Sequence, residues 1–212
     1  QSWMWKRHAG FDVVTYTGSG NAGQTLAHSL GRTPEMMWVA NMGAGGWFVY
    51  HKGLNGGTNP EDYYLTLNDT SAAYDNVTVW HDTAPTSTHF TAGTATVQQY
   101  YPHIAMLFAS TDVSAVGSYT GNGTSNSSSQ EIVTGFAPRF LIVKKTSGSA
   151  YWVVLDTLRG WGSGDDKWLQ LNDNAAQGDF NWGYPGPTGF VVRTNDSAIN
   201  ANNEKYIYYC HA

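Results

Sequence analysis

The sequence predicts an all-β protein that consists of two tandem homologous antiparallel β-sandwich units of jelly-roll-like character. Three observations support this prediction: the composition, the two-residue period of the apolar runs, and a set of motifs that occurs twice. Only 13% of the 212 residues are charged, about half the share in average soluble domains, and Gly, Thr, Ser and Asn, which favour turns and strands, take their place. The 9 Trp, 13 Tyr and 8 Phe can bury enough area to offset the chain entropy, which excludes a disordered chain.

A repeat with an offset of about 104 residues organises the chain. Five motifs return in the same order: residues 16–20 as 119–123, 36–39 as 140–143, 47–50 as 152–155, 64–69 as 168–173, and 104–109 as 207–212. A constant order and spacing indicates duplication of one folding unit. The sequence therefore predicts one unit at residues 12–111 and another at 116–212, with residues 1–11 as a link that precedes them.

Short apolar or alternating runs, separated by turns that contain Gly, Asn or Pro, predict the strands. In the first unit these runs are residues 11–17, 36–40, 47–50, 63–67 and 104–109; in the second they are 115–120, 140–144, 151–155, 167–171, 190–194 and 206–210. No segment carries a sustained helical stripe, and residues 70–74 and 175–176 allow one helical turn at most. The pairs Asn68–Asp69 and Asn172–Asp173 are expected to end a strand, because their side chains bond to nearby backbone.

One motif resembles a dinucleotide-binding loop. Gly18, Gly20 and Gly23 follow a predicted strand with G-x-G-x-x-G spacing. That function requires a helix next, and the following residues include Gly31 and Pro34 without an amphipathic stripe. We therefore interpret the motif as a glycine turn between strands.

The sequence offers no group suited to catalysis, so we expect no enzyme activity, no catalytic residue, no cofactor and no metal ion. Acidic residues are scattered apart from Glu61–Asp62 and Asp165–Asp166, and the seven His lack the spacing of metal ligands. The pair Asp165–Asp166 allows a Ca²⁺ site, but a solvated loop is the favoured interpretation. A net charge of −5 with no basic cluster beyond Lys144–Lys145 excludes a nucleic-acid partner, and no apolar run approaches the roughly 18 residues of a membrane helix.

Aromatic residues in loop-like segments are the candidate ligand-binding residues. Rings flanked by Asn and Asp suit the apolar face and the hydroxyl rim of a sugar, and the second unit supplies most of them. The alternative is that these rings pack at the ends of the sandwich core or at a subunit interface. The candidates are Trp80, His81, Trp161, Asp165, Asp166, Asn181, Trp182 and Tyr184.

Several motifs resemble a repeat domain that is common in tail fibre and other appendage proteins of tailed phages, especially marine phages of cyanobacteria. They are FDVVTYTG at 11–18, HSLG at 28–31, PEMMWV at 34–39, VYHKGL at 49–54, DTAPTS at 82–87, Phe90, and GSYTGNG at 117–123. The resemblance implies a β-rich virion domain, a homotrimer that contacts a host receptor or glycan, with residues 1–11 linking it to an upstream fibre segment. The chain departs from the family pattern at residues 100–103. A structural or decoration protein of the virion, and an accessory carbohydrate-binding module of a polysaccharide-degrading enzyme, are the alternatives.

Overall fold

Antiparallel strands make up nearly all of the regular structure, as the composition predicts. The computed structural model describes residues 10–43, 45–125, 129–162 and 164–212, so most of the expected link at residues 1–11 lies outside the described residues. The chain divides into two compact units: the residues up to Leu67 with Ala73–Thr111, and Asn68–Ala72 with Asp112–Ala212. The division after Thr111 falls beside the boundary that the repeat predicts, and the short segment 68–72 belongs to the second unit.

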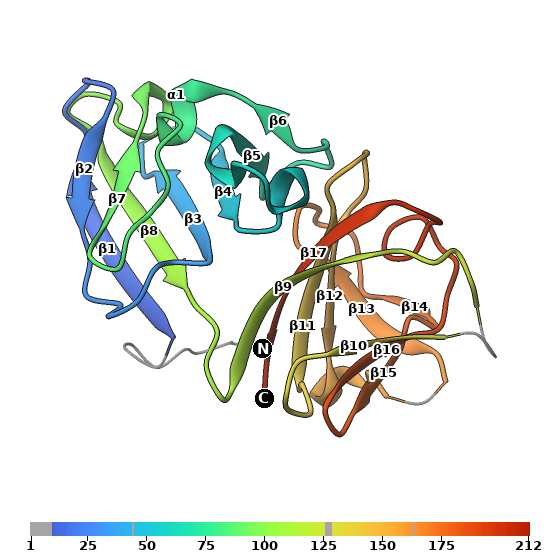
Figure 1. Cartoon of the computed structure of the whole chain (residues 1–212). Helices are drawn as coiled ribbons and strands as arrows, with labels where there is room; N and C mark the ends of the chain where they lie inside the picture. Colours follow the sequence, from blue (N-terminus) through green and yellow to red (C-terminus); the bar gives the residue numbers. More distant parts are fainter. Residues whose placement is uncertain (1–9, 44, 126–128, 163) are drawn as a thin grey trace. The chain divides into compact units, whose positions relative to one another are not determined.

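The first unit is built on a six-stranded antiparallel sheet (Figure 1). In spatial order its strands are β1 (Phe11–Thr17), β8 (Pro102–Phe108), β3 (Met36–Asn41), β4 (Trp47–His51), β5 (Tyr63–Thr66) and β6 (Tyr74–Asp75). A two-stranded sheet of β2 (Gln24–Ala27) and β7 (His89–Ala92) covers one face. The short helices of this unit are η1 (Leu54–Gly57), η2 (Pro60–Asp62), α1 (Val77–Trp80) and η3 (Thr94–Thr96).

The second unit has a six-stranded sheet of its own. Its strands are β9 (Ser114–Thr120), β17 (Lys205–His211), β11 (Phe140–Lys145), β12 (Trp152–Asp156), β13 (Asp166–Gln170) and β14 (Gly178–Phe180). The facing sheet has three strands, β10 (Gln130–Val133), β16 (Gly189–Val192) and β15 (Gly183–Gly186). One turn of 3-10 helix, η5 (Thr157–Arg159), follows β12.

The two six-stranded sheets have the same strand order, with β1, β8, β3, β4, β5 and β6 equivalent to β9, β17, β11, β12, β13 and β14. The register is also the same. Met36 pairs with His51 on one side and Phe108 on the other, as Phe140 pairs with Asp156 and His211. This correspondence is what duplication of one folding unit predicts.

Each core lies between a large sheet and a small one. In the second unit, Leu141 and Val143 of β11 share a buried cluster with Ile132 of β10 and Phe190 of β16. In the first unit, Val39 of β3 packs in a cluster with Leu26 and Phe90 of the small sheet, and with Leu107 of β8. Burial of such side chains stabilises a sandwich by about 1.5–3 kcal/mol each.

Some local expectations need correction. The helical turn that residues 70–74 allow does not form, because Tyr74 begins β6. The α-helix α1 forms nearby instead, where the Asn76 side chain accepts the Thr78 N–H at 3.0 Å. Of the small-sheet strands, only β16 falls on a predicted run, residues 190–194. Strands β2 and β10 each bury only one side chain and escaped prediction.

The turn predictions are confirmed. Asp69 and Asp173 follow β5 and β13, and each accepts, at Oδ1, a backbone N–H two residues later at 3.1 Å. The glycine motif after β1 leads into strand β2, not into a helix. A Cβ on Gly18 would lie 2.2 Å from the Gln98 carbonyl oxygen, so close backbone packing explains that glycine.

Candidate functional site

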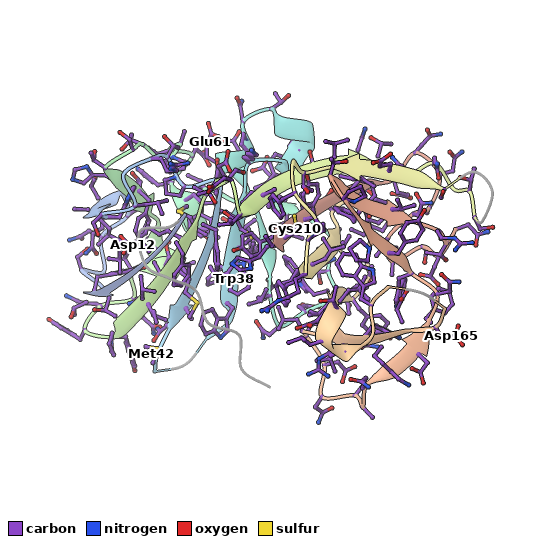
Figure 2. The ribbon with its side chains drawn as sticks, turned by 90° about the horizontal axis from the view of Figure 1, so that it is seen from below. Asp12, Trp38, Met42, Glu61, Asp165 and Cys210 are labelled. Carbon is purple, nitrogen blue, oxygen red and sulfur yellow. The ribbon has the colours of Figure 1, made fainter. Side chains whose placement is uncertain are left out.

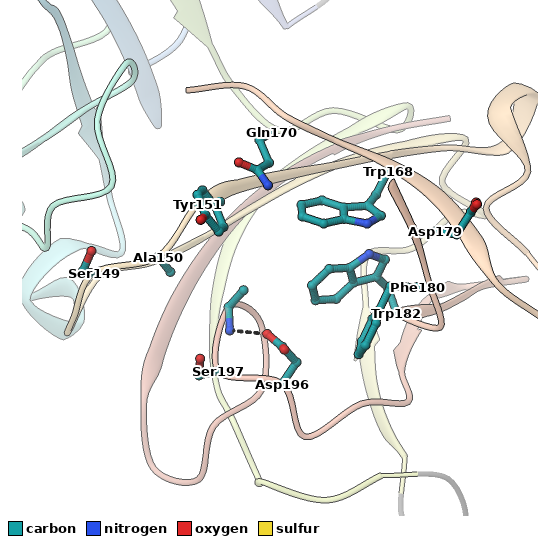
Figure 3. Close-up of a pocket in the computed structure, with 11 residues that line it drawn as sticks. Ser149, Ala150, Tyr151, Trp168, Gln170, Asp179, Phe180, Trp182, Asp196 and Ser197 are labelled. Carbon is teal, nitrogen blue, oxygen red and sulfur yellow. Dashed lines mark hydrogen bonds between the residues drawn. The ribbon is translucent and has the colours of Figure 1, made fainter. Parts of the chain in front are cut away.

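A pocket of about 450 Å³ lies within the second unit, at the β13–β14 end of its large sheet (Figure 3). This volume is in the range of roughly 300–1,000 Å³ that small-molecule sites occupy. The lining residues are Ser149, Ala150, Tyr151, Trp168, Gln170, Asp179, Phe180, Trp182, Asp196, Ser197 and Ala198. In Figure 3 the indole rings of Trp168 and Trp182 stand on one side of the pocket and Tyr151 on the other.

The position of the Trp168 ring depends on the residue that faces it across the sheet. Trp168 on β13 pairs with Gly178 on β14, and a Cβ at Gly178 would lie 2.6 Å from Trp168 Nε1. Only a residue without a side chain lets the indole lie this close to the neighbouring strand. The equivalent pair of the first unit is Tyr64 and Tyr74, whose rings contact each other with centroids 6.2 Å apart.

A buried carboxylate holds the second ring of the pocket. Asp166 at the start of β13 is fully buried, and its Oδ2 accepts the N–H groups of Trp182 and Gly183 at 2.8 and 3.1 Å. Its Oδ1 accepts the Gly162 N–H at 3.0 Å. Burial raises the pKa of Asp166 and the three donors lower it, with burial the larger effect. The carboxylate therefore fixes the backbone that carries Trp182.

The rings of the pocket also contact one another. Trp182 packs edge-to-face on Trp168, with centroids 5.1 Å apart, and lies 4.6 Å from the ring of Phe180. Trp182 is only 4% exposed. Its Nε1 and the Oε1 of Gln170 are buried atoms that have no hydrogen-bond partner among the described residues.

Polar groups complete the lining. Asp196 Oδ1 accepts the Ala198 N–H at 2.8 Å (Figure 3). Asp179 forms an ion pair with Lys167, which lies outside the lining. Tyr151 is 41% exposed, so its ring is accessible from solvent. Rings that a ligand can reach, with carboxylate and amide groups beside them, allow binding of a hydroxylated ligand with an apolar face.

The structure brings only part of the predicted set to this pocket. Trp182 lines it, and Asn181 lies between two lining residues in the chain. Asp165 is exposed at the outer edge of the unit (Figure 2) and is not among the lining residues. Tyr184 is also exposed outside the lining, with the Arg193 guanidinium 5.9 Å from its ring centroid.

The other predicted residues lie outside the pocket lining. Trp161 is 3% exposed, packs in the core cluster of the second unit and is not among the residues that line the pocket. Trp80 is buried in the first unit and donates from Nε1 to the Tyr63 carbonyl at 3.1 Å. Asp166 uses both oxygens on backbone N–H groups, as described above. His81 follows α1 with a φ of 56° and is exposed.

Sequence reasoning missed Tyr151, Trp168, Gln170, Phe180 and Asp196. Trp168 lies in a predicted strand, residues 167–171, and alternation alone does not tell an inner ring from one at the end of a sheet. A usable signal existed in the repeat, since Gly178 in one copy corresponds to Tyr74 in the other.

Among the described residues, no group of three or more His, Cys, Asp or Glu could hold a metal ion. None of the helices in the described part of the chain is long and apolar enough to cross a membrane.

Comparison with known proteins assigns the chain to a family. No curated protein matches the sequence, and no solved structure matches it. One family model matches residues 5–212, which is nearly the whole chain and includes both units. The chain therefore belongs to the family described as Domain of unknown function (DUF7483).

Proposed function

We propose that the chain is a non-enzymatic virion appendage domain, of the tail fibre kind, that recognises the host cell surface by binding a glycan in the second-unit pocket. The observation that carries the proposal is the combination of ring faces and fixed polar groups in one pocket. Trp168 and Tyr151 supply apolar faces for the C–H side of a sugar ring, and Asp196 supplies an acceptor for hydroxyls. The virion setting rests on the motifs that resemble phage appendage repeats.

Binding of the purified protein to host cells and to a glycan array tests this proposal. Tyr151→Ala removes an exposed ring from the pocket, so we expect a loss of affinity of about thirtyfold, as for a hot-spot residue, with an unchanged thermal midpoint. Tyr184→Ala is the matched control, because Tyr184 is a similarly exposed tyrosine of the same unit outside the lining. Equal binding by wild type and Tyr151→Ala, or by host and non-host cells, would overturn the proposal.

A separate observation supports assembly with other subunits. Met42, Tyr100 and Tyr101 of the first unit are 63%, 82% and 41% exposed. They are neighbours, because the Met42 N–H donates to the Pro102 carbonyl at 2.8 Å. Large exposed apolar side chains gathered at one place favour a protein interface. This favours the homotrimer, or a structural role in the virion, as the second candidate.

Light scattering on the longer fibre protein tests the assembly. We expect a trimer, and we expect Tyr100→Ser with Tyr101→Ser to weaken it. A monomeric fibre protein, or a trimer of unchanged stability in the double variant, would contradict this part of the proposal.

A further inference from the structure

The charge of the pocket bears on which class of sugar it accepts. We infer that the pocket takes a sugar without a negative charge and excludes acidic sugars such as uronic and sialic acids. This inference rests on the proposed glycan binding. The eleven residues of the lining include two carboxylates, Asp179 and Asp196, and neither Lys, Arg nor His. An acidic sugar would therefore meet the like charge of Asp196, and no cation of the lining would offset it.

Asp196 is the more important of the two carboxylates, because backbone and side-chain bonds hold it in place. Its N–H donates to Thr194 Oγ1 at 2.9 Å, and its carbonyl accepts the Asn200 N–H at 2.8 Å. Oδ1 accepts the Ala198 N–H, and no described residue donates to Oδ2. A fixed carboxylate oxygen at the pocket can accept a sugar hydroxyl and repels a sugar carboxylate.

The second carboxylate contributes less. Asp179 is paired with Lys167, and the two side chains are 52% and 42% exposed, so solvent screens this pair. The pair nevertheless adds no net positive charge to the site. The chain as a whole carries a net charge of −5, which adds a long-range repulsion of anionic ligands.

The aromatic rings of the pocket also favour a neutral sugar over an acidic one. The face of an indole or phenol ring carries the negative end of its quadrupole, so Trp168 and Tyr151 attract the C–H groups of a neutral sugar and disfavour a carboxylate laid over them.

Matched pairs of neutral and acidic sugars test the inference. The probes are methyl glucoside against methyl glucuronide and methyl galactoside against methyl galacturonide, titrated by NMR at about 20 and 500 mM NaCl. At low salt we expect each acidic sugar to bind at least about fivefold more weakly than its neutral counterpart, the effect of one like charge at about 4 Å in water. At high salt the affinities of the neutral and the acidic sugar should lie closer together, because salt screens the repulsion of the acidic sugar.

Two variants of equal net charge test whether the discrimination against acidic sugars arises in the pocket lining. Asp196→Asn removes a lining carboxylate and keeps an oxygen that can accept the Ala198 N–H. It should reduce the ratio of the affinity for the neutral sugar to the affinity for the acidic sugar by about fivefold. Asp165→Asn makes the same change in net charge outside the lining and should leave the ratio as in wild type. Equal binding of both members of each pair, or tighter binding of the acidic member, overturns the inference and leaves glycan binding standing. Binding of neither member of either pair, together with a blank glycan array, overturns the proposed function and the inference with it.

Discussion

The buried carboxylate of Asp166 offers the sharpest test of how this fold supports its pocket. In Asp166→Asn, the amide oxygen can replace Oδ2 and keep the bonds from the Trp182 and Gly183 N–H groups at 2.8 and 3.1 Å. The amide nitrogen then faces the Gly162 N–H, which donates to Oδ1 at 3.0 Å in the wild type. Two donors would meet there, so the Gly162 N–H would lose its acceptor.

The cost follows from these contacts. A partly buried N–H without a partner costs about 1–3 kcal/mol, and the two remaining bonds lose the contribution of the acceptor charge, which is about 1 kcal/mol each. Burial raises the pKa of Asp166 despite its three donors, so the neutral amide recovers part of the cost of burying a charge. We therefore expect a loss of about 2 kcal/mol in the free energy of unfolding. For a unit of roughly 100 residues this lowers the thermal midpoint by about 8–16 °C.

Thermal unfolding followed by tryptophan fluorescence and circular dichroism measures this effect. Asp165→Asn is the matched control: the neighbouring carboxylate is exposed, and its replacement should change stability by less than about 0.5 kcal/mol. Asp166→Ala should cost more than Asp166→Asn, because all three N–H groups lose their acceptor. Equal midpoints for Asp165→Asn and Asp166→Asn would refute the structural role of Asp166 and return it to the candidate ligand-binding residues.

Three further predictions concern the buried ring of Trp161, Gly178 beside the pocket, and the loss of stability at alkaline pH. Trp161→Ala should lower the free energy of unfolding by about 3–5 kcal/mol in urea titrations, and a loss below about 1 kcal/mol would mean that the ring lies outside the core. Gly178→Ala should displace the Trp168 indole, since the new Cβ would lie 2.6 Å from its Nε1; sugar affinity should fall about fivefold or more in a titration, and unchanged affinity would refute the role of this glycine. Burial raises the pKa of the Cys210 thiol to about 12 from an ordinary value of 9.0, so above pH 9 the unfolded chain releases a proton that the folded chain keeps. The stability of wild type relative to Cys210→Ala should therefore fall as the pH rises from about 9 towards 12 in urea titrations, and a constant difference would contradict this.

The large sheets were predictable because their strands carry a strong local signal. Residues 11–17 alternate and form β1 over the predicted range, and the apolar runs 36–40 and 140–144 become the buried strands β3 and β11. Of the small-sheet strands, only β16 carried such a run, at residues 190–194. Strand β2 has one buried side chain, Leu26, among its four residues, so alternation over so short a segment cannot be told from a loop.

The candidate site shows more clearly the contrast between what the sequence predicted and what the fold decided. A carboxylate in a Gly-rich segment suggested a ligand contact at Asp166, but the fold brings it the N–H groups of residues 16 and 17 positions away. Trp182 was predicted as a ligand residue and does line the pocket. Trp168 lies in a predicted strand and was not among the predicted site residues; it reaches the pocket because the residue across from it on β14 is a glycine.

The sequence by itself determined the fold class, the strands of the large sheets other than β6 and β14, and the repeat. The period of two and the recurrence of motifs are properties of consecutive residues. Only the tertiary structure decided which rings line the pocket. Trp161 and Trp168 both lie in Gly- and Asp-rich surroundings, yet one is in the core and the other in the pocket lining. The physical reason is that burial of a ring and the bonding of a carboxylate depend on the segments that pairing and packing bring beside them, and these lie far away in the chain.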